Sequence, residues 1–78
     1  MKLTVLSLNG VEFDGEAKAF TAKTTTGEIT VLDHHRPLVT ILAEGLAKIR
    51  QASGEVKELA IRSGFLEVSL NTVMVLID

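Results

Sequence analysis

The sequence has no cysteine, no tryptophan and no tyrosine, and it has a single proline. Without cysteine the chain has neither disulfides nor thiolate sites, which is compatible with a reducing compartment. Three phenylalanines are the only aromatic residues, so the core must be built mainly from Val, Leu and Ile. The lack of Trp and Tyr also removes the stacking platform that sugar-binding proteins usually present.

The chain also lacks a strong charge of one sign. Eight basic and ten acidic residues give a formal net charge of −2, and the Lys and Arg residues are scattered singly. A nucleic-acid partner requires clustered cations that meet the phosphate backbone. The sequence therefore predicts no binding to nucleic acid.

Long apolar runs are absent as well. The longest, such as residues 73–77, are far shorter than the roughly 20 residues that a membrane helix needs. The first residues lead directly into a strand pattern without the apolar core of a signal peptide. A chain of 78 residues is expected to form one domain, residues 1–78, that buries roughly 60% of the surface of its unfolded form. We expect a soluble, cytosolic domain.

Alternating apolar residues and closely spaced turn signals predict an all-β sandwich. The expected turns lie at residues 9–10, 14–15, 26–27, 44–45, 63–64 and 70–71, with a loop at residues 52–55. The expected strands include residues 2–8, 11–13, 16–24, 46–51, 56–61, 65–69 and 72–77. The expected core includes Val5, Phe20, Leu32, Ile41, Ile49, Leu66 and Val75, because each lies on an apolar strand phase.

Residues 38–50 are ambiguous, because their apolar residues also fit a helical stripe and Pro37 suits a helix's first position. Three consecutive β-branched residues at 39–41 disfavour that helix. A turn at residues 44–45 would divide the run into two strands of ordinary length. We therefore predict two strands.

Few residues in the sequence are candidates for catalysis or metal binding. His34 and His35 are adjacent, so in extended chain they project in opposite directions and cannot easily hold one metal ion. Asp33, His35 and either Ser63 or Ser7 are the residue types of a hydrolytic triad, but no nucleophile-elbow sequence surrounds either serine. No glycine spacing fits a phosphate cradle. We expect no catalytic residue, no metal and no cofactor.

The apolar residues themselves favour a binding role. A domain this small cannot cover Val, Leu and Ile on both phases of several strands, and exposed apolar surface often marks a partner site. Binding is therefore favoured over catalysis.

Two segments carry a family resemblance. Residues 27–40 read G-E-I-T-V-L-D-H-H-R-P-L-V-T, and residues 64–76 read G-F-L-E-V-S-L-N-T-V-M-V-L. In this order, and with the opening strand K-L-T-V-L-S, they resemble the N-terminal β-sandwich domain of the epsilon subunit of rotary F-type ATP synthases. The matching family pattern is G-E-x-x-x-L-x-x-H-x-P-L-x-T followed by G-F-L-E-V and N-x-V-x-V-L. The resemblance covers essentially the whole chain.

The resemblance implies a flattened sandwich of two antiparallel sheets with about ten short strands. It implies a non-catalytic rotor subunit at the foot of the central stalk, bound to the gamma subunit and to the polar loops of the c-ring, that couples proton flow to ATP synthesis. Such a subunit lies on the cytoplasmic face of the energy-coupling membrane as a peripheral part of the F1 sector. It would touch the membrane only indirectly, through the c-ring.

The resemblance also assigns positions to partners. Gly27 and Glu28 resemble the turn that faces the c-ring loops, while Ser7, His35 and Thr40 resemble positions that face gamma. A carboxylate on a rigid turn, such as that of Glu28, suits pairing with cationic loop residues.

A structural corner is expected at Pro37 and Leu38. Pro37 fixes its own φ and pushes Arg36 into an extended conformation. One residue departs from the family pattern, since His34 stands where the family often has Gly, and this affects the direction in which His35 points.

Family members usually continue into a C-terminal domain of two helices, which is not in this sequence. We expect a chain that assembles and couples but binds no nucleotide and does not inhibit ATP hydrolysis. Two other classes stay open on the residues alone. One is a free-standing β-sandwich module for a peptide or carbohydrate, and the other is a small hydrolase that uses His35.

Overall fold

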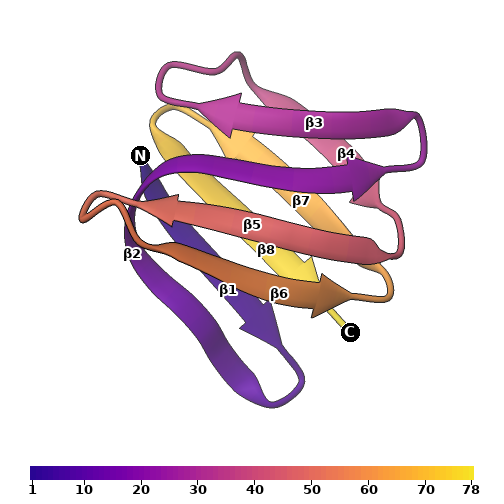
Figure 1. Cartoon of the computed structure of the whole chain (residues 1–78). Coiled ribbons are helices and arrows are strands. Elements are labelled where there is room, and N and C mark those ends of the chain that lie inside the picture. Colours follow the sequence, from indigo (N-terminus) through magenta and orange to yellow (C-terminus); the bar gives the residue numbers. More distant parts are fainter.

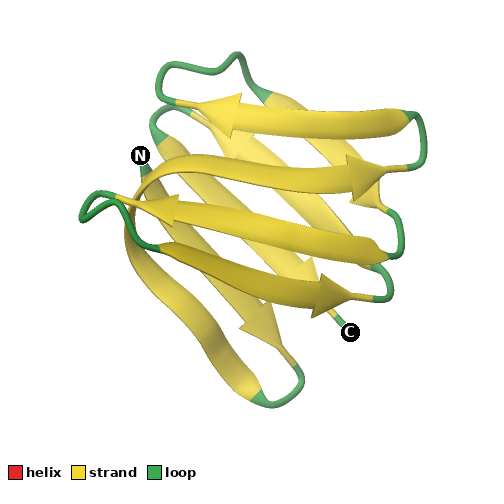
Figure 2. Cartoon of the chain, in the orientation of Figure 1, coloured by secondary structure: helices red, strands yellow, loops and turns green.

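A computed structural model describes all 78 residues of the chain. It consists of strands joined by short loops and turns, without a helix (Figure 2). The strands are β1 (Lys2–Ser7), β2 (Gly10–Thr24), β3 (Gly27–Leu32), β4 (Leu38–Leu42), β5 (Gly45–Gln51), β6 (Val56–Ile61), β7 (Gly64–Ser69) and β8 (Thr72–Ile77). No helix long and apolar enough to span a membrane is present.

The strands form two packed layers (Figure 1). One layer contains β3, the second half of β2, β5 and β6, in that order. The other contains β4, β7, β8, β1 and the first half of β2. The aliphatic side chains between the layers form a single core cluster. The prediction of an all-β sandwich is confirmed.

Strand β2 belongs to both layers. Its first half pairs with β1, and its second half pairs with β3 and β5. The register shifts between Val5 and Leu6 on the β1 side and between Ala17 and Ala19 on the β5 side. Such irregularities bend a strand and increase its twist, so they allow β2 to cross from one layer to the other.

The predicted turn at residues 14–15 is wrong. Asp14 pairs with Thr4 and Gly15 pairs with Leu3, both within the ladder between β1 and β2. Gly15 also lacks the positive φ that a tight hairpin turn requires, whereas Gly10 and Gly27 have it. The pairing with β1 overrides the local Asp-Gly signal, so residues 11–13 and 16–24 belong to one 15-residue strand.

Two further details differ from the implied fold. The chain has eight strands rather than about ten, partly because β2 is continuous. In addition, β1 and β8 pair in parallel, whereas the other pairs are antiparallel. These two strands come from opposite ends of the sequence, so no tight hairpin forces them to be antiparallel.

The second half of the chain agrees with the predicted boundaries. Residues 38–50 form two strands, β4 and β5, rather than a helix. The predicted loop at residues 52–55 separates β5 from β6, and residues 70–71 form the turn between β7 and β8.

The predicted core is correct at five positions and wrong at two. The buried positions are Val5, Phe20, Ile49, Leu66 and Val75, each 0% exposed. Leu32 and Ile41 instead point outward, with 56% and 57% of their surface exposed. Their neighbours Val31 and Leu42 are buried in their place, because adjacent strand residues face opposite sides.

Register explains which of two adjacent apolar residues is buried. Val31 lies opposite Phe20, which faces the core, so Leu32 must face outward. Ile41 lies opposite Phe65, whose side chain is also exposed. A shift of one residue would exchange the two faces of either strand.

Replacement of Leu66 tests this core. We expect Leu66→Ala to lower the free energy of unfolding by about 2–5 kcal/mol, because it leaves a cavity among fully buried neighbours. Ile41→Ala is the control and should cost less than about 0.5–1 kcal/mol, since Ile41 is mainly exposed. Urea denaturation followed by circular dichroism measures both, and equal losses would contradict the assignment of faces.

Candidate functional site

The corner between β3 and β4 comprises residues 33–37. It begins as a turn in which the backbone N–H of His35 donates to the carbonyl of Leu32 at 3.2 Å. His34 has a φ of 65°, the left-handed conformation that most L-residues avoid. The His35 ring nitrogen Nδ1 lies 2.8 Å from the carbonyl of Arg36 and bonds to it. Pro37 is exposed, whereas Leu38 packs against the core.

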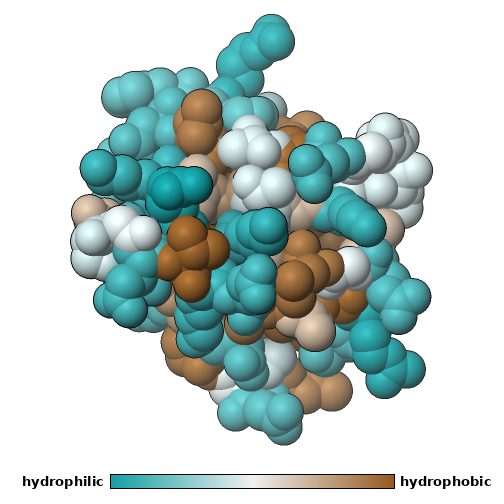
Figure 3. Space-filling model, in the orientation of Figure 1, coloured by the Kyte–Doolittle hydropathy of each residue, from teal (hydrophilic) through white to brown (hydrophobic).

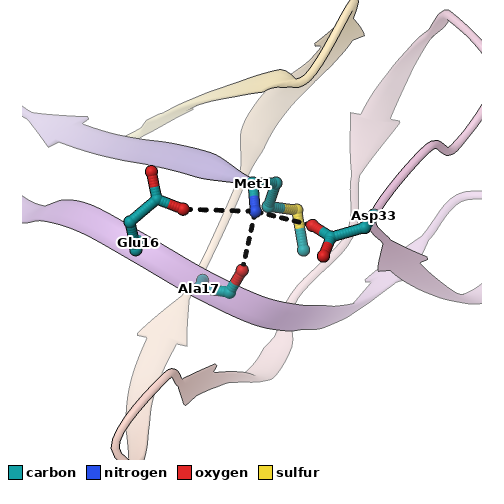
Figure 4. Close-up of polar contacts among 4 residues, drawn as sticks. All are labelled: Met1, Glu16, Ala17 and Asp33. Carbon is teal, nitrogen blue, oxygen red and sulfur yellow. Dashed lines mark hydrogen bonds and ion pairs between the residues drawn. The ribbon is translucent and has the colours of Figure 1, made fainter.

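The amino group of Met1 ties this corner to the sheet (Figure 4). It donates to Asp33 Oδ1 at 2.6 Å and to the carbonyl of Ala17 at 3.0 Å. The carboxylate of Glu16 lies 3.4 Å away. The Met1 side chain is buried, so the contact joins β1, β2 and the corner at one point.

These contacts shift two pKa values. The hydrogen bond to Asp33 is the main reason that the pKa of the Met1 amino group lies above its ordinary value of 8.0, although burial opposes the shift. The same bond is the main reason that the pKa of Asp33 lies below its ordinary value of 3.8. Each charged group therefore stabilises the charged form of the other.

The shifts define a pH window for the contact. Folding lowers the pKa of Asp33. The stabilisation of the folded state by this carboxylate is therefore present above pH 3.8 and is lost as the pH falls through the lowered pKa. Folding raises the pKa of the Met1 amino group. The stabilisation of the folded state by this amino group is therefore complete below pH 8.0 and is lost as the pH rises through the raised pKa.

Asp33→Asn tests this window. We expect the variant to be less stable than the unsubstituted chain at neutral pH, and the difference to shrink at both acid and alkaline pH. Denaturant midpoints measured from about pH 2 to 11 give the two profiles. Glu55→Gln, a substitution in the exposed loop between β5 and β6, is the control. Parallel profiles for Asp33→Asn and the unsubstituted chain would contradict the assigned contact.

The turn between β2 and β3 is held firmly. The hydroxyl of the buried Thr24 donates to the carbonyl of Gly27 at 2.6 Å and accepts from the N–H of Thr26 at 3.2 Å. Gly27 has a φ of 128°, which favours glycine at that position. Glu28 is exposed next to this turn and forms none of the chain's ion pairs. The turn therefore presents an unpaired carboxylate on a rigid support.

The remaining predicted positions lie apart from each other. Ser7 ends β1, and its hydroxyl donates to Glu12 Oε2 at 2.6 Å. Thr40 lies in β4 and is half-buried opposite Leu66. Strands β8 and β7 separate β1 from β4. His35 lies near the end of β3 that is opposite Gly27 (Figure 1), so the positions do not form one cluster.

The described groups do not assemble into a site for catalysis. No hydrogen bond joins Asp33, His35 and a serine, because Asp33 bonds to Met1 and the His35 ring bonds to Arg36. No group of three or more His, Cys, Asp or Glu residues could hold a metal ion.

One shallow hollow of about 210 Å³ lies on the outer face of β2, β5 and β6. Its lining residues are Ala19, Thr21, Lys48, Arg50, Val56 and Glu58. The face formed by β3, β2, β5 and β6 shows separate apolar patches among polar side chains (Figure 3).

Comparison with known proteins identifies the family. Residues 1–78 match the family model described as ATP synthase, Delta/Epsilon chain, beta-sandwich domain. The chain belongs to this family. The resemblance found in the sequence is thereby confirmed.

Relatives and solved structures agree with this assignment. The chain is 37% identical over 76 residues to the ATP synthase epsilon chain of an Exiguobacterium species, covering 97% of this chain and 56% of that protein. It is 32% identical to the chloroplastic ATP synthase epsilon chain of Medicago sativa, covering 100% of this chain and 57% of that one. The chain thus spans less than two thirds of the length of these curated relatives.

Two solved structures share the fold. One is a chain of the Euglena gracilis mitochondrial ATP synthase, solved with OSCP, F1 and c-ring, with a TM-score of 0.89 and 27% identity over 96% of this chain and 48% of that one. The other is a chain of the Tetrahymena thermophila mitochondrial ATP synthase, from a structure of central stalk and c-ring. Its TM-score is 0.82 with 22% identity, covering 99% of this chain and 62% of that one.

The backbone conformation of the corner between β3 and β4 can be tested by substitution. His34→Gly should raise the free energy of unfolding by about 0.5–1 kcal/mol, because glycine adopts a positive φ without steric cost. His35→Gly is the control and should lower it by about 0.5–1 kcal/mol, since a glycine without a positive φ adds backbone entropy to the unfolded chain, and this substitution also removes the bond from the ring to Arg36. Thermal unfolding followed by circular dichroism compares them. A stabilised His35→Gly or a destabilised His34→Gly would show that the corner has another conformation.

Proposed function

We propose that this chain is a non-catalytic rotor subunit of the F-type ATP synthase. It lies at the foot of the central stalk, binds the gamma subunit and the polar loops of the c-ring, and couples proton flow to ATP synthesis. The observation that carries the proposal is the family match over residues 1–78. Relatives named ATP synthase epsilon chain and the fold shared with an ATP synthase chain support it.

The proposed location follows from these partners. The chain is a peripheral part of the F1 sector on the cytoplasmic face of the energy-coupling membrane. It reaches the membrane only through the c-ring.

We assign the contact with the c-ring to Gly27 and Glu28. Thr24 and Gly27 hold the turn in one conformation, so little conformational entropy is lost when a partner binds. The Glu28 carboxylate has no ion-pair partner in the chain. A cationic group on a c-ring loop would therefore meet a carboxylate that is already positioned and available.

We assign the contact with gamma to Ser7, His35 and Thr40. Ser7 and Thr40 belong to strands of the same layer, and His35 lies in the corner that leads into β4. Strands β8 and β7 lie between β1 and β4 in this layer. The proposed gamma contacts therefore come from separate strands and the corner, and not from a single loop.

Charge reversal at Glu28 tests the contact with the c-ring. In reconstituted enzyme, Glu28→Lys should reduce ATP-driven proton pumping, because a like charge then faces the cationic loops. ATP hydrolysis and the circular dichroism of the isolated chain should be preserved. The matched control is Glu55→Lys in the exposed loop between β5 and β6, at the other end of the same layer (Figure 1). Unchanged pumping by Glu28→Lys would remove Glu28 from the contact.

A further inference from the structure

The hollow on the outer face of β2, β5 and β6 lies over two neighbouring rows of paired residues. Strand pairing aligns its lining as Thr21, Lys48 and Glu58 in one row and Ala19, Arg50 and Val56 in the other. The two long cations of β5 therefore stand beside the short Ala, Thr and Val side chains of the neighbouring strands. This difference in length leaves a space of about 210 Å³.

The two cations of the hollow are available to a ligand. Lys48 and Arg50 are exposed and take part in none of the chain's ion pairs. They are two residues apart in β5, so both side chains project from the same face. By contrast, Arg62 lies 3.7 Å from the carboxylate of Asp78. An ammonium and a guanidinium group that share one hollow attract an anion, and the guanidinium fork suits an oxyanion in particular.

A hydroxyl group adds a third donor to the hollow. Thr21 Oγ1 lies 3.1 Å from Thr30 Oγ1 on the neighbouring strand β3, and either hydroxyl can be the donor of that bond. A hydroxyl both donates and accepts. When Thr30 donates to Thr21, the proton of Thr21 is available to a ligand oxygen in the hollow.

Glu58 makes the hollow selective. Its carboxylate belongs to the same lining and forms none of the chain's ion pairs. Two cations against one carboxylate still leave the lining with an excess of positive charge. An ionised carboxylate accepts hydrogen bonds and donates none. It therefore repels a ligand oxygen without a proton and binds one that carries an O–H.

The size of the hollow limits the ligand further. Its volume of about 210 Å³ is below the roughly 300–1,000 Å³ of sites that hold drug-sized molecules. A whole nucleotide is therefore too large, whereas a single tetrahedral oxyanion fits.

We propose that this hollow binds free inorganic phosphate. Lys48, Arg50 and Thr21 donate to the phosphate oxygens, and Glu58 accepts from the phosphate O–H. Inorganic phosphate keeps at least one proton at neutral pH, sulfate keeps none, and a phosphate monoester loses its last proton above about pH 6. The hollow therefore favours free phosphate over sulfate and over the phosphate esters of nucleotides and lipids.

The phosphate site goes beyond the function proposed above and does not depend on it. None of the residues that line the hollow is among the positions proposed for the c-ring or for gamma. Failure of the phosphate site would therefore leave the proposed function untouched.

Titration of the ¹⁵N-labelled chain with inorganic phosphate, followed by nuclear magnetic resonance at about pH 7.5 and constant ionic strength, tests the site. We expect saturable shifts of the backbone amide signals around the hollow in β2, β5 and β6. Sulfate and methyl phosphate should bind about fivefold or more weakly, because neither can donate to Glu58. Shifts that do not saturate, or that sodium chloride reproduces, would overturn the proposal.

A pair of arginine substitutions tests the donors. Arg50→Ala should weaken phosphate binding about tenfold, because it removes a charge-assisted hydrogen bond. Arg36→Ala is the matched control and should bind within about twofold of the unsubstituted chain, since Arg36 is exposed in the corner and lies outside the hollow. Lys48→Ala is a second substitution in the hollow. Circular dichroism confirms that the variants are folded, and equal affinity in all four chains would show that phosphate binds elsewhere.

The role of Glu58 is tested by selectivity. Glu58→Gln replaces a group that only accepts with an amide that also donates. Sulfate should then bind about fivefold or more tightly than it does to the unsubstituted chain, so that the preference for phosphate shrinks. Unchanged selectivity in Glu58→Gln would remove Glu58 from the site. Equal binding of sulfate and phosphate by the unsubstituted chain would show a general anion site and would also overturn the proposal.

Discussion

The structure depends on the continuity of β2 through both layers. A small aliphatic core is stable only if its two layers are held together. Strand β2 holds them because it pairs with β1 in one layer and with β3 and β5 in the other. The transition occurs around Ala17, next to the irregularity in the ladder with β5. There Met1 and Ala17 exchange two hydrogen bonds, of 3.0 and 2.9 Å. The Met1 amino group also donates to Asp33 in the corner between β3 and β4. The corner is therefore attached to the chain where β2 passes from one layer to the other.

Much of the fold is legible in the sequence because alternation and turn residues act locally. The strands after residue 44 follow that rule, and so does the split of residues 38–50 into two strands. The wrong predictions arise where pairing between strands that are distant in the sequence determines the structure. The Asp-Gly pair at residues 14–15 is a turn signal in isolation, but pairing with β1 keeps it extended. Leu32 and Ile41 each stand next to another apolar residue, so the sequence allows either phase, and only the partner strand determines which is buried.

The site residues illustrate a different limit. Gly27 is visible as a turn glycine from its sequence, and its positive φ bears this out. No local pattern, however, connects Ser7 with Thr40, because strands β8 and β7 lie between them. The grouping of the exposed Ile41, Phe65 and Leu76 is hidden for the same reason, since only the pairing of β4, β7 and β8 brings them together. Exposed apolar surface was predictable from composition, but its location requires the order and register of the strands.

The two proposed contacts differ in kind, and β2 connects them. The contact with the c-ring is polar and lies at a tight turn, where Thr24 at the end of β2 supports Gly27. The proposed contact with gamma is spread over separate strands of the other layer, in which the first half of β2 pairs with β1. A rotor element must transmit force between its partners without unfolding or shearing. Strand β2 is hydrogen-bonded to β1 over its first half and to β3 and β5 over its second half, so it is held on both sides along its length. In the proposed assembly, β2 therefore links the layer that carries Ser7 and Thr40 to the turn that carries Gly27 and Glu28, and the hydrogen bonds between Met1 and Ala17 support it where its ladder with β5 is irregular.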